Sequence, residues 1–218
     1  MKPKHSMPTS ALVDYNVCPS CHIVSRGQRK HAREDKCPRC GAPAEGAKLF
    51  FPRSAVSLVC LMEEMFGPAG GPEGKGTTEA IPQHRAGGMV ILYCTLVEVL
   101  LQSFLEKFMG KVGIPEKVQI KLFKDNVSVT RRIWELFLAI TDVDWKDAVR
   151  MLRTSYGVSV LKVIKFYTRV SEARNRFFYG GLDAPIPEEL PRQCLDHVST
   201  LLALFVALHN EYIAKLVF

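Results

Sequence analysis

Four of the seven cysteines fall in two pairs whose spacing suits metal binding. The pairs are Cys18-Pro-Ser-Cys21 and Cys37-Pro-Arg-Cys40, separated by fifteen residues, and Gly41 follows the second pair. Two Cys-x-x-Cys pairs at this separation are typical of a structural zinc site with four thiolate ligands. Proline fixes one backbone angle of each turn, and the glycine allows backbone amides to point at the sulfurs. We therefore predict one Zn²⁺ per chain on Cys18, Cys21, Cys37 and Cys40.

Two disulfides are the alternative use of the same four cysteines. The N-terminus, Met1-Lys-Pro-Lys-His-Ser, lacks the apolar segment of a secretory signal, so we expect a reducing, cytoplasmic location. A thioredoxin-like redox pair is disfavoured because there are two such pairs and no βαβ pattern around them. The segment resembles a zinc ribbon. The other cysteines lie in apolar helical stretches and are expected to be inert core residues: Cys60, Cys94 and Cys194.

The segment between the two cysteine pairs is strongly basic. Arg26, Arg29, Lys30 and Arg33 lie within eight residues. Such a loop can contact the phosphates of a nucleic acid; a solvated loop tip is the alternative, and small zinc ribbons also bind proteins. Residues 1–53 hold ten Lys and Arg against four Asp and Glu, so most of the formal net charge of +7 lies there. Long-range attraction of a polyanion is therefore expected to act mainly through this quarter of the chain.

A second group of candidate residues ends a strongly periodic helical stretch, just before Gly180-Gly181. Four residues spaced by four, three and four positions share its apolar face: Val163, Tyr167, Val170 and Arg174. Arginine keeps its charge in proteins, so on such a face it must bind an anion. The anion is either a phosphate from outside or a carboxylate of this chain, and Glu98, the lone charge in the middle of the apolar stretch 89–109, is the candidate carboxylate.

Around Arg174 the chain resembles the HEPN family (higher eukaryotes and prokaryotes nucleotide-binding). The family motif is an Arg, usually a polar residue such as Asn, and then a His after four to six intervening residues, often followed by Gly. Arg174, Asn175 and Gly180 match this pattern, and Tyr179 stands where the family has its His. The resemblance covers most of residues 89–216, although only the stretch around Arg174 is specific.

The resemblance implies a homodimer in which two motifs face each other. Many HEPN domains are metal-independent endoribonucleases of toxin–antitoxin and anti-phage systems, and others are inactive RNA-binding or scaffolding versions. In the active versions a ribose 2′-hydroxyl attacks the adjacent phosphate. Here Arg174 would neutralise that phosphate, Asn175 would orient it, and Glu98 could orient the arginine. The proton-carrying His would stand at Tyr179.

A tyrosine at position 179 is compatible with two alternative functions of the protein. A phenol with a pKa near 10 is ionised to about one part in a thousand at neutral pH, so it is a poor base. It can still donate a hydrogen bond or stack on a nucleobase. The chain is thus expected to be an RNA-directed endoribonuclease of a defence or toxin type, or else a catalytically inactive module that binds RNA or assembles with a partner such as an antitoxin. The hypothesis of a DNA-binding regulator is less well supported, since no recognition helix accompanies the basic loop.

A basic stripe follows the same helical stretch beside its apolar face. Its members are three, four and seven residues apart and form a candidate RNA-binding surface: Lys162, Lys165, Arg169 and Arg176. An ordinary solvated helix face is the alternative, and most such stripes are of that kind.

The predicted architecture is all-α, a HEPN-like helical bundle preceded by a small four-cysteine zinc ribbon. The ribbon and its linker occupy residues 1–53 and the helical domain residues 54–218. Apolar periodicity predicts helices over 54–66, 89–109, 115–124, 128–141, 145–152, 156–178 and 187–216. Trp134 is expected to face the core. Residues 42–52 and the Gly- and Pro-rich segment 67–88 are expected to be connections, with strands only in the ribbon.

Three helical stretches are too apolar to share one small core: 89–109, 158–178 and 194–216. A symmetric homodimer would cover the excess. No membrane partner is expected, because the longest apolar run, Met89 to Leu101, has 13 residues and is too short to span a bilayer.

Overall fold

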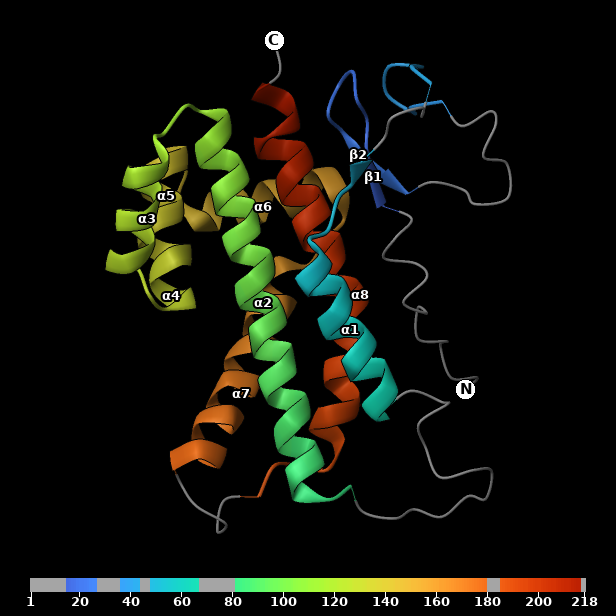
Figure 1. Ribbon diagram of the computed structural model, residues 1–218, viewed down its shortest axis with the longest axis vertical. Coiled ribbons are helices and arrows are strands. Elements are labelled where there is room, and N and C mark those ends of the chain that lie inside the picture. Colours follow the sequence, from blue (N-terminus) through green and yellow to red (C-terminus); the bar gives the residue numbers. More distant parts are fainter. Residues whose placement is uncertain (1–14, 27–35, 44–47, 67–80, 180–184, 217–218) are drawn as a thin grey trace.

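The computed structural model describes residues 15–26, 36–43, 48–66, 81–179 and 185–216. A long central helix, α2 (Gln83–Lys111), runs through most of the molecule (Figure 1). Helices α1 (Arg53–Phe66) and α8 (Glu189–Tyr212) pack on it, and so does α7 (Val160–Tyr179). The described residues are therefore mostly helical, as predicted, and the helices form a bundle around α2.

Helix α2 begins six residues earlier than predicted, at Gln83 instead of residue 89. Residues 83–88, expected in a connection, are therefore helical. The glycines that suggested a connection serve packing instead: a Cβ at Gly87 would overlap the ring of Phe177, and one at Gly88 would lie 3.0 Å from Met65 Cε. Pro82, with its fixed φ, precedes the first turn.

The length of α2 also affects the expectation that no helix is long enough to span a membrane. The longer helix is apolar enough to cross a bilayer by length and composition, contrary to the expectation from the 13-residue run. However, 56% of its most apolar 18-residue stretch is buried inside the fold. That burial is expected of a helix at the centre of a bundle, which is apolar nearly all round because neighbours cover several of its faces.

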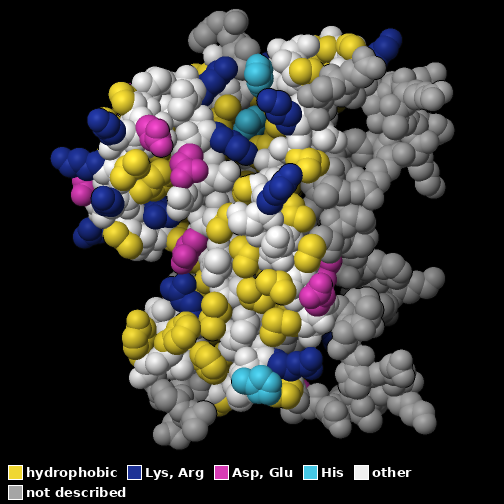
Figure 2. All heavy atoms as spheres, in the orientation of Figure 1, with side chains coloured by type: hydrophobic (Ala, Val, Ile, Leu, Met, Phe, Trp, Pro, Cys, Tyr) yellow, Lys and Arg dark blue, Asp and Glu magenta, His cyan; other side chains and the backbone are white. Residues whose placement is uncertain are grey.

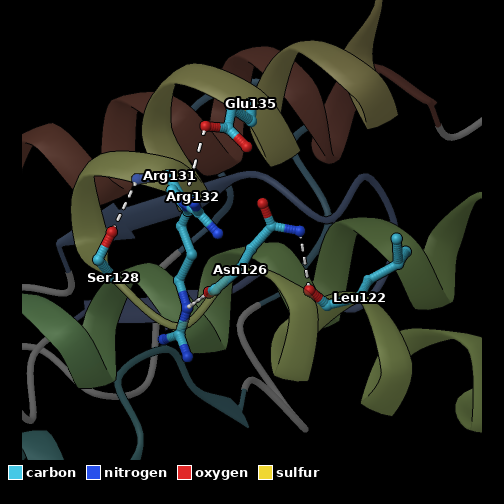
Figure 3. Close-up of polar contacts among 6 residues, drawn as sticks. All are labelled: Leu122, Asn126, Ser128, Arg131, Arg132 and Glu135. Carbon is cyan, nitrogen blue, oxygen red and sulfur yellow. Dashed lines mark hydrogen bonds and ion pairs between the residues drawn. The ribbon is translucent and has the colours of Figure 1, made fainter.

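After α2 the chain forms α3 (Glu116–Asp125), α4 (Val129–Arg131), a π-helical turn (Arg132–Leu136) and α5 (Phe137–Thr141). Ser128 caps this segment by accepting a hydrogen bond from Arg131 N (3.2 Å), and Arg132 Nε donates to Asn126 O (2.9 Å) (Figure 3).

Trp134 lies in the π-helical turn and is 44% exposed, so its predicted core position is wrong. Leu136 and Phe137 occupy the core here, and the ring of Trp145, the first residue of α6 (Trp145–Tyr156), packs edge-on against Phe137 at 4.8 Å. The wide π turn shifts the helical register, which residue spacing alone could not indicate.

The boundary between α6 and α7 also differs from the prediction. Tyr156 and Gly157 end α6 instead of starting the next helix, because Gly157 has a φ of +66° and forms the C-cap. The predicted apolar face of α7 is confirmed: Val163 and Val170 are buried, and Tyr167 is half-buried. The chain closes with α8 and a short 3₁₀ turn, Ala214–Leu216.

The described strands all lie near the cysteines, as predicted. They are β1 (Tyr15–Val17), β2 (Val24–Arg26) and β3 (Lys48–Leu49), and they form an antiparallel sheet of order β2-β1-β3. Strand β3 was not expected, since it falls in the predicted connection 42–52. The aromatic residues after it, Phe50 and Phe51, are buried and tie this segment to the core.

The sheet is bound to the helical bundle through side chains of α8. Asn210 accepts a hydrogen bond from Val24 N (2.7 Å) and donates to Val24 O (3.0 Å), so its amide group pairs with β2 much as a neighbouring strand would. His209 Nε2 lies 3.0 Å from His22 O, and Lys107 Nζ of α2 donates to Phe50 O (2.9 Å).

Candidate functional site

The four predicted metal ligands come together. The sulfur atoms of Cys18, Cys21, Cys37 and Cys40 all lie within 4.8 Å of one another. Each cysteine pair forms a tight turn, closed by hydrogen bonds from His22 N to Cys18 O (3.0 Å) and from Gly41 N to Cys37 O (2.9 Å).

The two turns share one backbone shape. Gly41 has a φ of +70°, and His22 takes the same left-handed conformation with a φ of +56°. Glycine adopts this conformation without strain, whereas His22 is held in it by the bond of its carbonyl to His209. The two Cys-Pro-x-Cys segments have the same spacing, and they fold into turns of the same shape, one on each side of the site.

The sulfur separations exclude disulfides in this structure. Cys18 Sγ lies 3.7 Å from Cys40 Sγ, and Cys21 Sγ lies 3.5 Å from Cys37 Sγ. A disulfide requires about 2.05 Å, whereas sulfurs bound tetrahedrally to one zinc ion at about 2.3 Å lie about 3.8 Å apart. The donor set and its spacing therefore fit a metal ion.

The thiols of the cluster differ in pKa. Burial alone raises the pKa of Cys18, but hydrogen bonds from the backbone N–H groups of Cys21 and Ser20 outweigh it and lower the pKa to about 6. Burial raises the pKa of Cys21 to about 12, and the neighbouring thiols add to the increase. One thiolate thus forms readily, while the next needs a cation to compensate the added charge.

Arg174 is paired with Glu98, the carboxylate predicted from sequence. Arg174 Nη1 donates to Glu98 Oε1 at 3.1 Å, and the arginine side chain is 26% exposed. Burial lowers the pKa of Arg174, but nearby Cys94 and the bond to Glu98 outweigh this and raise it, so its charge is permanent. Among the described residues no acceptor lies within bonding distance of its Nη2 or Nε, so those donors can still bind a second anion.

One stripe of α2 faces α7. Residues at steps of three and four belong to it: His84, Gly87, Ile91, Cys94 and Glu98. Gly87 meets the Phe177 ring and Glu98 meets Arg174. His84 was missed in the sequence because residues 67–88 were taken as a connection. It lies seven residues before Ile91, which lies seven residues before Glu98, and this spacing indicated the stripe. It lies fourteen residues from Glu98, about 21 Å along the helix, and so does not reach Arg174.

Tyr179 does not join Arg174 in this structure. The tyrosine is 89% exposed, whereas Arg174 lies against α2. The histidines of α8 contact other groups and not Arg174. His209 Nε2 bonds to His22 O, and the ring of His197 stacks on Phe166 with ring centroids 3.9 Å apart. Within the described ranges, no histidine contacts Arg174. Of the predicted site residues, Arg174 and Glu98 are brought together, and Tyr179 and the exposed Asn175 are not.

The predicted basic stripe lies on the surface of α7. Lys162, Lys165, Arg169 and Arg176 are all exposed. Arg169 is engaged by α8, since its Nη2 lies 2.6 Å from Glu189 Oε1 and its Nη1 donates to Gln193 (2.9 Å). In the basic loop, the backbone of Arg26 ends β2, while Arg29, Lys30 and Arg33 lie outside the described residues.

Comparisons with protein-family models, curated proteins and solved structures find no match for this chain. The resemblance to HEPN domains therefore rests on the residues around Arg174 alone.

Proposed function

We propose that this protein is a HEPN-like RNA-binding protein with a structural zinc ribbon. One observation carries the proposal: Arg174 is permanently charged and partly buried, and among the described residues only its Nη1 makes a hydrogen bond, to Glu98. Its Nη2 and Nε would then be available to a second anion. An arginine that served only as a structural ion pair would be expected to use its planar fork on the carboxylate with two hydrogen bonds. A phosphate is the anion that this remaining fork fits. Asn175 follows Arg174 in the sequence and is exposed.

Binding without cleavage is the form of this function that the geometry supports best. General acid–base catalysis requires a group within hydrogen-bond reach of the proton that moves. Tyr179 is turned to solvent, and the described histidines lie elsewhere. The second candidate, a metal-independent endoribonuclease of a toxin or anti-phage type, is favoured by the Arg174-Asn175 pair. It requires a proton carrier that the described residues do not bring to Arg174.

The zinc ribbon belongs to the same proposal. Zinc on Cys18, Cys21, Cys37 and Cys40 supplies no redox chemistry but fixes two turns of the chain. The basic loop between the cysteine pairs would then add phosphate contacts to those of the bundle.

A second copy of this chain is the proposed protein partner. Figure 2 shows hydrophobic side chains across the middle of one face, over α1 and α2. On these two helices, Leu61 is exposed, and Leu58, Leu92 and Val99 are only partly buried. An isologous contact over this face would cover these side chains. Light scattering at micromolar protein concentration tests it: a dimer mass that Leu61→Glu converts to a monomer mass supports the contact, and a native monomer contradicts it.

Binding and cleavage are tested together on zinc-loaded protein and labelled RNA in buffer without magnesium. Arg174→Ala should lower RNA affinity by about 10- to 100-fold, the usual loss for a hydrogen bond to a charged group. Arg131→Ala is the matched control, because Arg131 forms only an exposed ion pair with Glu135, 3.9 Å away. Equal affinity of native and Arg174→Ala protein would contradict the proposal, and rapid cleavage by native protein would favour the nuclease.

A further inference from the structure

A stripe of exposed residues on α7 ends at Tyr179. Its members follow at steps of four and three along the solvent face: Lys165, Arg169, Glu172, Arg176 and Tyr179. The predicted basic stripe thus continues past Arg176 to an aromatic ring. Tyr179 shares this face with Arg176, three residues earlier, and does not share the α2-facing side with Arg174.

Two aromatic side chains are exposed at this end of α7. Tyr179 is 89% exposed and Phe178 is 57% exposed. An exposed aromatic ring contributes little hydrophobic free energy to folding, because little of its surface is removed from water. Among the described residues, Tyr179 makes no hydrogen bond or ring contact. The Phe178 ring packs edge-on against Phe177, with ring centroids 5.9 Å apart, whereas no packing role in the described part of the fold is seen for Tyr179.

The backbone that carries the two rings is firmly held. Phe177 fills the space over Gly87 of α2. One turn before Gly87, Gln83 bonds reciprocally with Ile186, accepting from Ile186 N (2.8 Å) and donating to Ile186 O (3.3 Å). The end of α7, the start of α2 and the segment before α8 are thus tied together, and the rings are presented from a fixed position.

Cations accompany Tyr179 on the same face of α7. Lys165 and Arg176 are exposed, and in the described part of the chain no carboxylate lies within ion-pair distance of either. Arg169 is occupied by Glu189, and Glu172 lies between the cations, so the stripe offers separate contact points and not a continuous positive surface. Separate cations that lead to exposed rings suit a flexible strand with unstacked bases better than a rigid duplex.

We propose that the ligand of this surface is single-stranded RNA, with phosphates on Lys165 and Arg176 and an unpaired base stacked on Tyr179 beside Phe178. The inference rests on the proposed RNA-binding function and gives Tyr179 a role as a stacking residue that sets the preference for unpaired bases. A duplex offers this surface only its phosphates, because its bases are already stacked.

The test uses the zinc-loaded full chain and fluorescence anisotropy with a labelled single-stranded oligoribonucleotide, alone or annealed to its complement. Tyr179→Ala should weaken single-strand binding by about 5- to 100-fold, as loss of one base stack does. Tyr179→Phe, which keeps the ring, should bind as the native protein does, and duplex binding should be the same in all three. Leu161→Ala, which removes another exposed side chain of α7, is the matched control.

Salt dependence separates stacking from charge. Arg176→Gln should lower the slope of log affinity against log salt by about 0.7, whereas Tyr179→Ala should leave the slope unchanged. Native single-strand binding that Tyr179→Ala does not alter would overturn this inference and leave the proposed function standing. Absence of RNA binding by the native protein would overturn both.

Discussion

At the residue scale, Gly87 decides how closely α7 approaches α2, since the Phe177 ring occupies the space where a Cβ would be. That contact positions the end of α7 and its exposed rings. The Arg174–Glu98 pair lies about three turns further along α2, beyond Cys94. The absence of a side chain at Gly87 thus allows the close approach of the two helices that carry Arg174 and Glu98.

We predict that Gly87→Ala destabilises the fold by about 1–3 kcal/mol, because the Phe177 ring must leave its position. Gly110→Ala is the control in the same helix. Nothing lies within 4 Å of its added Cβ, so that change should stabilise the protein by about 0.4–1 kcal/mol. Urea unfolding measures both, and equal effects of the two changes would show that the Phe177 contact is unimportant.

His209 makes the junction between ribbon and bundle sensitive to pH. Burial lowers the pKa of His209 to about 4, and nearby Lys107 adds to the effect, although the bond to His22 O opposes it. The unfolded chain, with an ordinary His pKa near 6.5, binds more protons between these values. Stability from this group is thus complete above about pH 6.5 and is lost as the pH falls toward about 4.

The expected loss between about pH 7.5 and about pH 5 is roughly 1–2 kcal/mol, measured as the free energy of unfolding in urea. His209→Gln keeps a donor for His22 O but does not titrate, so it should lose less over the same range. Comparison of the two proteins removes the contribution of the cysteine ligands. Identical pH dependence in both would contradict the neutral, buried state of His209.

At the scale of elements, α8 joins the ribbon to the bundle through Asn210, whose side chain pairs with both backbone groups of Val24. Metal binding should therefore stabilise the helices as well as the ribbon. We predict that zinc removal by a chelator lowers the midpoint of thermal unfolding, followed by helical circular dichroism, by about 5–15 °C, which corresponds to a few kcal/mol.

Asn210→Ala should reduce the effect of the chelator on the helices, because it removes both bonds to β2. Asn126→Ala is the control, since its amide bonds only to Leu122 O at the end of α3 (Figure 3). If the chelator leaves the helical midpoint of native protein unchanged, the ribbon and the bundle fold independently and the predicted coupling is wrong.

Much of the element order was predictable, because apolar residues at steps of three and four identify a buried helical face whatever it packs against. Cysteine spacing likewise indicated the metal site, since the ligands of each turn are local in sequence. Glu98 was identified as a partner for Arg174 because it is a lone charge in an apolar stretch. These features depend on short-range patterns.

Other features depend on contacts between distant segments and were missed. Gly87 and Gly88 suggested a connection because the side chains that fill their space, Phe177 for Gly87 and Met65 for Gly88, are distant in the sequence. Trp134 was placed in the core because a π turn leaves no trace in residue spacing. Tyr179 was assigned to the Arg174 site from the motif alone, whereas helical geometry places it with Arg176 on another face.

At the scale of the whole molecule, the net charge of +7 lies mostly in residues 1–53, and the described strands β1 and β2 of that segment lie toward the other end of α2 from the end of α7 (Figure 1). Neutralising Arg26, Arg29, Lys30 and Arg33 should lower the log–log salt slope of single-strand binding by about three if each contacts a phosphate. An unchanged slope would assign RNA contact to α7 alone.

The central claim is that Arg174 binds RNA phosphate and is not merely the ion-pair partner of Glu98. RNA affinity of Arg174→Ala and Glu98→Gln, measured side by side with native protein, tests it most directly. Glu98→Gln removes the competing carboxylate, so RNA affinity should be maintained or rise, while Arg174→Ala should lose about 10- to 100-fold. If both variants lose stability and neither changes RNA affinity, Arg174 serves only the ion pair and the claim is contradicted.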